Sequence, residues 1–359
     1  MKIARAAVQP TFDEAWTTGG GGAGAPVPRA PQAPAAPRRA RRAGAALALA
    51  LALALAGAPQ AAPAGAGLAA AAHAAERAAA AGWTTAQMAA RGAAALDVPP
   101  AAAGAPSVRV WYSPRMSAEA RLVGNLAARS APAVFHDLGV RPPARVTVVL
   151  EPDQATMNAD LHLGSSASPM GAYWRGVVWV LAPSAWLGPD PEGWSAFSAQ
   201  ARTFAHDGPV VHELAHMALD LKVAGRAPAW FDEGVAQWEE ARRTGFVWRE
   251  PANDLDQPLY SYEELSRSFD RLSNVALAYR EAYVLVDALS RAQGGHGLQA
   301  VLDRMAAGAT VDEAAHEVLG AGYADWRGGA PWRAAAAADA AVARAGAGSG
   351  AGAQPAAGR

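Results

Sequence analysis

The stretch His212-Glu213-Leu214-Ala215-His216 constrains this chain more than any other part of its sequence. On a helix, two histidines four positions apart lie on the same face, so both imidazoles can reach one metal ion. Glu213 lies about 100° further round the helix, where its carboxylate can reach a metal-bound water without being a ligand. This H-E-x-x-H spacing is typical of zinc-dependent hydrolases, in which zinc acidifies the water and the glutamate takes its proton.

Apolar residues around this motif predict the helix that its geometry requires. They recur at helical spacing and would form one buried stripe, made of Val211, Leu214, Ala215, Ala218 and Leu219. We expect Asp207 to cap this helix and Pro209 to lie in its first turn. The alternative is a helix with two hydrogen-bonded, half-buried histidines and no metal, and the segment that follows argues against it.

A carboxylate for a third ligand lies in that next segment. A catalytic zinc ion takes three protein ligands and keeps one position open. Glu233 follows His216 by 233 − 216 = 17 residues, and Gly225 and Pro228 allow one helix to end and a second, antiparallel helix to begin. Asp232 is the competing carboxylate, but adjacent helical residues point about 100° apart. We expect Asp232 to be an exposed first-turn charge, favoured by the helix dipole.

The two blocks together resemble the gluzincin metallopeptidases, and in particular the bacterial family called peptidase MA-like. H-E-L-A-H followed by P-x-W-F-x-E-G-x-A matches the motif of that family, and Leu277–Leu289 looks like its L-A-Y-x-x-x-Y-x-L-V-x-x-L helix. The resemblance covers residues 107–333. It implies a general base at Glu213 and one bound zinc ion (Zn²⁺) held by His212, His216 and Glu233.

The resemblance also suggests residues around the metal. Many relatives carry an acidic residue four positions after the ligand glutamate, where it orients a zinc histidine. This chain has Gln237 there, which can still accept a hydrogen bond from an imidazole but polarises the ring less. Tyr279 and Tyr283 share one helix face, and one hydroxyl, with Tyr283 slightly preferred, would stabilise the oxyanion. The alternative for both tyrosines is a place in the core or behind the site.

A substrate-binding strand is expected just upstream of the zinc helix. In proteins similar to this one, the strand before that helix edges the active site and pairs with an extended peptide. The residues that would supply this edge are Gly171, Ala172 and Tyr173. An ordinary edge strand explains the same sequence equally well.

Composition and charge exclude several classes of protein. The chain of 359 residues has no cysteine, which excludes disulfides, cysteine-ligated zinc and thiol catalysis. Residues 1–42 carry seven basic and two acidic side chains, and residues 43–61 carry none, so a total charge of −1 leaves −6 on the rest. No basic stripe remains, and we therefore expect no nucleic-acid partner.

The N-terminal sequence has the order of a secretory signal. Four arginines between residues 38 and 42 precede an apolar run over residues 43–58, and small residues follow. We expect residues 36–61 to be a cleaved signal peptide, or alternatively an uncleaved anchor that makes the protein's only membrane contact. The protein would then be exported, either extracellular or in the cell envelope. Because the signal lies deep in the chain, residues 1–35 are expected to be disordered or to precede the true start, for which Val27 is a candidate.

The remaining sequence predicts one domain between two segments without a core. Residues 62–106 read mainly as an Ala-rich linker, in which the stretch near residues 68–81 is compatible with a helix. Residues 334–359 read as a disordered tail. In between, β-rich runs at 108–112, 146–150 and 171–181 come first and helical patterns follow. This order predicts an α+β fold over residues 107–333, with a small N-terminal sheet and a mostly helical C-terminal half, as in a zincin-like metallopeptidase domain.

These observations favour an exported zinc-dependent metallopeptidase acting on a peptide or protein substrate. Zinc would activate a water molecule, and Glu213 would be the general base of peptide-bond hydrolysis. The alternative is a catalytically inactive envelope binding module that retains the zincin fold. That role does not need Glu213, and the intact motif argues against it.

Overall fold

The computed structural model describes residues 2–6, 64–164, 167–195 and 198–320, together with short helical pieces between residues 333 and 341. Residues 1–7 and 65–359 form one compact unit. The expected signal segment, residues 36–61, and most of the segments 1–35 and 334–359 lie outside the described residues. Within the described part of the chain, no helix combines the length and the apolar character needed to cross a membrane.

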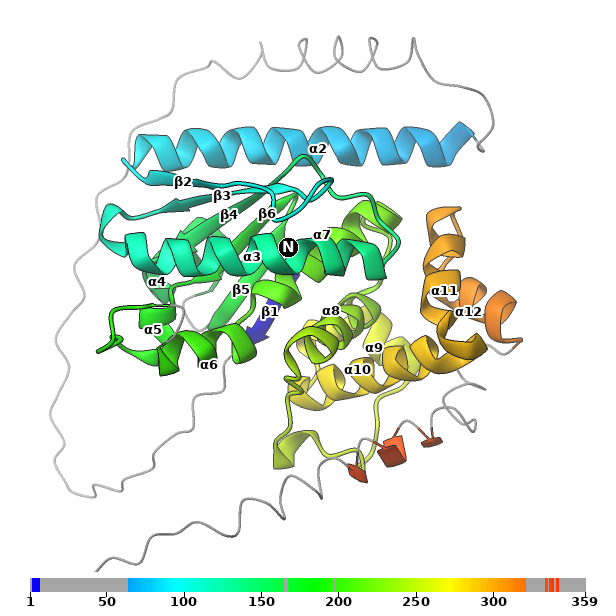
Figure 1. Ribbon diagram of the computed structural model, residues 1–359. Coiled ribbons are helices and arrows are strands. Elements are labelled where there is room, and N and C mark those ends of the chain that lie inside the picture. Colours follow the sequence, from blue (N-terminus) through cyan, green and yellow to red (C-terminus); the bar gives the residue numbers. More distant parts are fainter. Residues whose placement is uncertain are drawn as a thin grey trace, which may run out of the picture. The chain divides into compact units, whose positions relative to one another are not determined.

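A six-stranded mixed sheet has the strand order β1-β5-β6-β4-β3-β2 (Figure 1). The central strands β3, β4 and β6 run parallel, whereas β1, β2 and β5 run antiparallel to their neighbours. The β-rich runs predicted from the sequence are strands, and the last of them is the hairpin β5–β6. The bounds are β1 (Lys2–Ala6), β2 (Ala94–Val98), β3 (Ser107–Tyr112), β4 (Arg145–Glu151), β5 (Pro169–Trp174) and β6 (Val177–Leu181).

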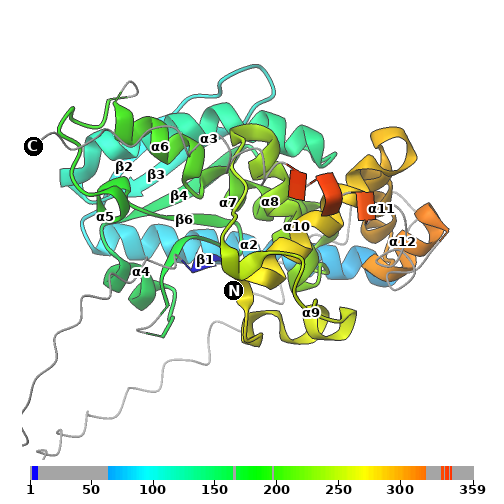
Figure 2. The same cartoon turned by 90° about the horizontal axis from the view of Figure 1, so that it is seen from below.

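Helices cover both faces of the sheet (Figures 1 and 2). α3 (Ser117–Asp137) and α7 (Val210–Val223) pack on one face, and α2 (Ala64–Ala90) and α4 (Gln154–Asp160) pack on the other. Successive side chains of a strand point to opposite faces. Accordingly, Val148 of β4 belongs to the core under α3, while Val149 belongs to the core under α2.

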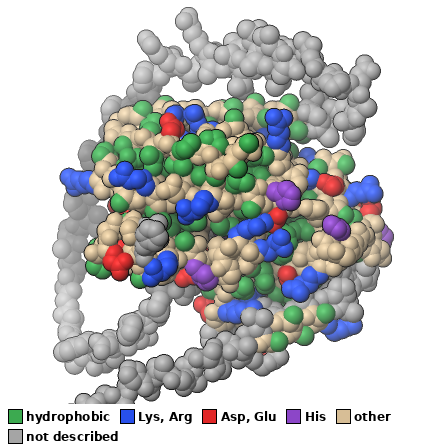
Figure 3. Space-filling model, viewed as in Figure 1, with side chains coloured by type: hydrophobic (Ala, Val, Ile, Leu, Met, Phe, Trp, Pro, Cys, Tyr) green, Lys and Arg blue, Asp and Glu red, His purple; other side chains and the backbone are tan. Residues whose placement is uncertain are grey.

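The Ala-rich segment expected as a linker over residues 62–106 is part of the folded unit instead. It forms α2, followed by β2, which pairs with β3. Alanine is the best helix former, and its small side chain lets α2 lie close to the sheet, with Ala80 and Met88 buried. Apolar side chains gather on the part of the surface where Figure 1 places α2 and β2 (Figure 3). Composition alone does not separate such a helix from a flexible linker.

β1 is a second element that was not expected from the sequence. Residues Lys2–Ala6 lie within the range 1–35, for which no regular structure was predicted, and they pair antiparallel with β5. The outer edge of β5 therefore carries an extended segment of this chain.

The chain after the sheet is helical, which confirms the predicted α+β class. Short helices α5 (Pro183–Leu187) and α6 (Ala199–Asp207) lead to α7, and α8 (Ala229–Thr244) packs against both α7 and α10 (Val275–Arg291). The remaining helices are α9 (Tyr262–Ser268), α11 (Gly297–Ala306) and α12 (Val311–Leu319). Short 3-10 helices lie at Pro114–Met116, Pro251–Asn253, Phe269–Arg271 and Ala292–Gly295.

Candidate metal centre and active site

The H-E-x-x-H motif lies on α7, as its apolar spacing predicts. Pro209 takes the N-cap position of α7, and Asp207, expected to be that cap, is the last residue of α6. The helix ends at Ala224, which has φ 51°, and Gly225 follows with φ 73°. These two left-handed residues turn the chain so that α8 can return against α7.

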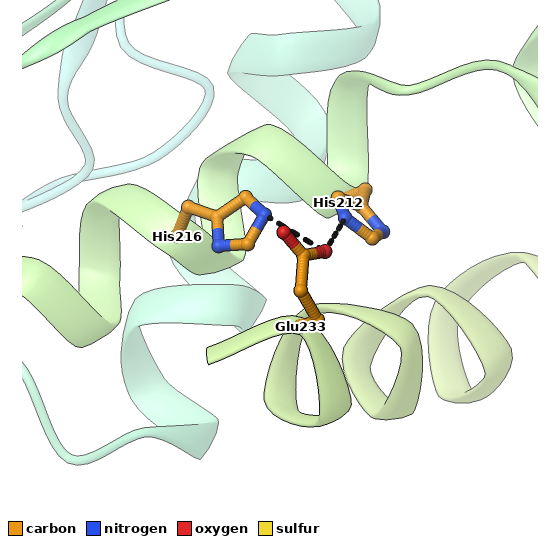
Figure 4. A group of neighbouring side chains, drawn as sticks. All are labelled: His212, His216 and Glu233. Atoms are coloured by element: carbon orange, nitrogen blue, oxygen red, sulfur yellow. Dashed lines mark hydrogen bonds and ion pairs between the residues drawn. The ribbon is translucent and has the colours of Figure 1, made fainter. Parts of the chain in front are cut away.

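Three buried side chains converge between α7 and α8 (Figure 4). Oε2 of Glu233 lies 3.2 Å from Nε2 of His212 and 3.6 Å from Nε2 of His216. The potential ligand atoms of these residues all lie within 4.8 Å of one another. The structure thus brings together the three residues that the sequence pattern singles out as metal ligands, and they could hold a metal ion.

Two carboxylates lie behind the imidazoles. Oδ1 of Asp232 is 2.8 Å from Nδ1 of His216, and Oε2 of Glu240 is 3.5 Å from Nδ1 of His212. A proton on each Nδ1 then faces a carboxylate, which leaves the Nε2 lone pairs directed at the space beside Glu233. Asp232 was expected at the solvent, but its exposed fraction is 1%. That expectation is wrong because α8 is enclosed by its neighbours, so its first turn has no solvent side.

Gln237 connects two helices instead of orienting an imidazole. Its Nε2 donates to the backbone carbonyl of Tyr279 on α10 at 2.7 Å, and to the carbonyl of Glu233 at 3.4 Å. The carboxylate beside His212 comes from Glu240, seven residues after Glu233 and two turns along α8. A helical repeat of seven residues is the sequence signal that identifies Glu240, because residues seven apart share a helix face.

The charges of the cluster are coupled. Burial alone would lower the pKa of His212, but the carboxylates of Glu233 and Glu240 outweigh it and raise that pKa to about 9. Asp232 and Glu233 likewise raise the pKa of His216. Burial would raise the pKa of Glu233, yet the two imidazoles hold it below its usual value. The carboxylates therefore make a positive charge between these side chains favourable. Two imidazole nitrogens and one carboxylate oxygen are a donor set that fits a divalent metal ion.

Glu213 lies beside the cluster with no exposed surface. Burial raises the pKa of its carboxyl group to about 8. Among the described residues, neither of its carboxylate oxygens has a hydrogen-bond partner. Burying a carboxylate without a hydrogen-bond partner lowers the stability of the fold. Its position beside three potential metal ligands therefore points to a functional role for Glu213 and not to a role in stabilising the fold.

A comparison with protein families identifies the region that contains this cluster. Residues 200–335 match the family model described as the peptidase MA superfamily. This region is therefore similar to that superfamily. The match includes α7, α8 and α10, whereas the sheet and α2 lie outside it. No curated protein matches the sequence.

The expected substrate strand lies directly against Glu213. Gly171, Ala172 and Tyr173 belong to β5, and a Cβ atom on Gly171 would lie 2.7 Å from Oε1 of Glu213. Tyr173 is buried and donates its hydroxyl to Asp220 of α7 at 2.7 Å. This hydrogen bond fixes β5 to the helix that carries both histidines, so the strand and the metal cluster are held as one unit.

The two tyrosines of α10 have different surroundings. Tyr279 is buried, and its ring centroid lies 5.7 Å from that of Trp248 and 5.2 Å from that of Phe269. Tyr283 lines a groove of about 800 Å³ on the other side of α10, and the lining of this groove includes none of the three potential ligands. Tyr283 shares the lining of this groove with Trp238 and Asp287, and the structure does not place it among the three potential ligands. An oxyanion role for Tyr279 stays a prediction.

Proposed function

We propose that this protein is an exported zinc metallopeptidase of the gluzincin type. One observation carries the proposal: three buried potential ligand atoms lie within 4.8 Å of one another, beside a buried glutamate that has no hydrogen-bond partner among the described residues. This arrangement lies in the region that matches the peptidase MA superfamily, and a peptidase-type domain indicates a peptide or protein substrate.

His212, His216 and Glu233 would hold one zinc ion in this proposal. When bound, zinc supplies a Lewis acid and lowers the pKa of a water molecule to about 7. Asp232 lies 2.8 Å from Nδ1 of His216, and Glu240 lies 3.5 Å from Nδ1 of His212. Both carboxylates favour a proton on Nδ1, which would leave Nε2 of each ring for the metal.

Glu213 would act as the general base and then as the proton donor to the leaving amine. Its two oxygens have no partner within the described structure and are free to exchange a proton. The substrate would lie along β5, because Gly171 of that strand lies directly against Glu213. A glycine there leaves room for the carboxylate, since a Cβ atom would collide with it.

Export is the part of the proposal that rests on sequence alone. It is supported by the order of basic, apolar and small residues over 36–61. A metal-binding set without cysteine is compatible with an oxidising environment, in which free thiols would be at risk.

The deciding experiment measures metal content and hydrolysis on the same preparation of the chain in its expected mature form, which lacks β1 and leaves the edge of β5 open. Mass spectrometry should find one zinc ion per chain. Cleavage of a denatured protein should stop when a chelator is added and return when zinc is restored. A zinc-loaded chain that cleaves nothing would favour the inactive binding module, and cleavage that persists without metal would overturn the metallopeptidase assignment.

A further inference from the structure

One tryptophan of α2 is exposed where a core residue would be buried. Trp83 has 44% of its surface exposed, and no other large hydrophobic residue of the described chain is exposed to this extent. Its ring meets that of Trp174 edge-on, with centroids 5.8 Å apart and an interplanar angle of 75°. Large exposed aromatic surface is unfavourable in water, so such a pair commonly marks a binding surface.

This aromatic pair lies at one end of the strand that flanks Glu213. Trp174 is the last residue of β5, and Gly171, against Glu213, is three residues earlier. Trp174 and Ala172 pack with the core under α2, whereas Tyr173 packs with the core under α7. Glu213 therefore lies next to one face of the strand, and the Trp83–Trp174 pair lies on the other face.

β1 shows how an extended segment lies along β5. It runs antiparallel, with Lys2 opposite Tyr173, Ile3 opposite Ala172 and Ala4 opposite Gly171. In this register, the residue opposite Trp174 lies three positions before the residue opposite Gly171. Directly opposed residues of an antiparallel pair place their side chains on the same face of the sheet, with Cβ atoms about 5 Å apart. The side chain opposite Trp174 thus points to the face where Trp83 is exposed.

We propose that Trp83 and Trp174 form a subsite for a large apolar side chain of the peptide substrate. The side chain belongs to the residue three positions N-terminal to the one that pairs with Gly171. This inference rests on the proposed peptidase function, because it assumes that substrate lies along β5. It gives α2 a part in substrate selection, although α2 lies outside the region that matches the family.

Nearby charges define what the subsite rejects. The guanidinium of Arg175 lies 5.6 Å from the centre of the Trp174 ring. Arg77 of α2 lies beside Gly176, where a Cβ atom would meet its side chain at 3.3 Å. The guanidinium of Arg175 next to the aromatic rings disfavours a lysine or arginine of the substrate at this position, whereas the charge of Arg77 is paired with Asp220. The expected order of preference is an aromatic or large aliphatic side chain, then alanine, then a basic side chain.

Binding of short peptides tests the subsite without requiring cleavage. The probes are acetylated, fluorescent heptapeptides with the sequence of residues 1–7, in which the first residue is phenylalanine, alanine or lysine. Binding is measured by fluorescence anisotropy on the zinc-loaded chain in its expected mature form, which begins at α2 and lacks β1, so that the edge of β5 is open. This chain carries Glu213→Gln, which prevents turnover. We expect the phenylalanine peptide to bind about five- to tenfold more tightly than the alanine peptide, because an aromatic ring is removed from water. The lysine peptide should bind most weakly.

Two substitutions in α2 distinguish a specific loss of the subsite from a general effect of mutating this helix. Adding Trp83→Ala should reduce the phenylalanine-to-alanine ratio to within twofold. Glu76→Ala, another exposed position of α2, should leave the ratio unchanged. Thermal unfolding of both variants should resemble that of the parent chain. A parent chain that does not distinguish the peptides, or a preference that survives Trp83→Ala, overturns the proposal.

Cleavage profiling then separates this proposal from the proposed function. With a peptide library and the chain with Glu213 intact, a preference for large apolar residues should appear at one position N-terminal to the cleaved bond, and Trp83→Ala should remove it. Cleavage with the same preference in both chains would refute the subsite and leave the peptidase standing. An intact peptide-binding preference without any cleavage would refute the peptidase and leave the subsite standing.

Discussion

Glu213 is the residue whose chemistry can be separated most cleanly from metal binding. Its carboxylate is buried beside the three potential ligands but is not one of them. Glu213→Gln should therefore retain zinc and the fold, while hydrolysis falls by about a hundredfold or more, as expected on loss of a general base. Metal analysis, unfolding curves and cleavage rates of the purified variant test this. Turnover equal to that of the unchanged chain would exclude Glu213 as the base.

Asp232 and Glu233 are neighbours in sequence with different expected effects on the metal. Glu233→Ala removes a potential ligand atom and should lower zinc affinity by orders of magnitude. Asp232→Ala removes the carboxylate that faces Nδ1 of His216 and should lower the affinity by about 10- to 100-fold. Titration against a competing chelator measures both. Glu263→Ala, an exposed acidic position on α9, is the control and should leave the affinity unchanged.

At the scale of elements, the sequence predicted helices with a clear apolar period well and a helix without one only in part. The spacing of Val211, Leu214 and Ala218 identified α7 correctly. α2 was expected only as a helical stretch near residues 68–81 within a linker, because alanine contributes almost no contrast between the two faces of the helix and no clear period is visible. The prediction that Asp232 faces solvent was wrong for a related reason. An apolar repeat predicts a helix with one buried face and one solvent-exposed face, whereas α8 is buried on several sides.

α8 also depends on a close approach to α10. A Cβ atom on Gly234 would fall against the backbone carbonyl of Ala282 and the side chain of Val286. Gly234→Ala should therefore lower the free energy of unfolding by about 1–3 kcal/mol, as for other overpacked interiors. Gly82→Ala is the matched control on α2: its Cβ meets nothing within 4 Å, and alanine should stabilise the helix by about 0.5–1 kcal/mol. Denaturant unfolding of both variants tests the contrast.

Glu239 gives α8 a pH-dependent contribution to stability. Burial, assisted by Asp137, raises the pKa of Glu239 from its usual 4.5 to about 8 in the folded protein. Between these two values, the folded state holds a proton that the unfolded state has lost, so the free energy of unfolding decreases as pH rises from about 5 to 8. Glu239→Gln should lose less stability over this interval. Unfolding measured at pH 5 and pH 8 for both chains tests this, and equal slopes would contradict it.

At the scale of the whole molecule, α2 forms hydrogen bonds to α7, the helix that carries His212 and His216. Nε2 of His73 lies 2.6 Å from the carboxylate of Asp220, which also accepts the hydroxyl of Tyr173. Arg91, the first residue after α2, pairs with the buried carboxylate of Asp160. Removing the chain through Arg91 would leave Asp160 buried without this ion pair and Asp220 without His73, which is strongly destabilising. Any processing of the chain must therefore leave α2 in place.

This requirement narrows the expected processing site. Signal-peptide anatomy places cleavage between about residues 58 and 67, whereas α2 begins at Ala64. We expect the exported protein to begin before or within the first turn of α2, and N-terminal sequencing of the secreted or envelope fraction tests this. Such cleavage also removes Lys2–Ala6, so the edge of β5 beside Glu213 becomes open to a peptide strand. A mature protein that begins beyond His73, or one that retains residue 1 in the cytoplasm, would refute this route.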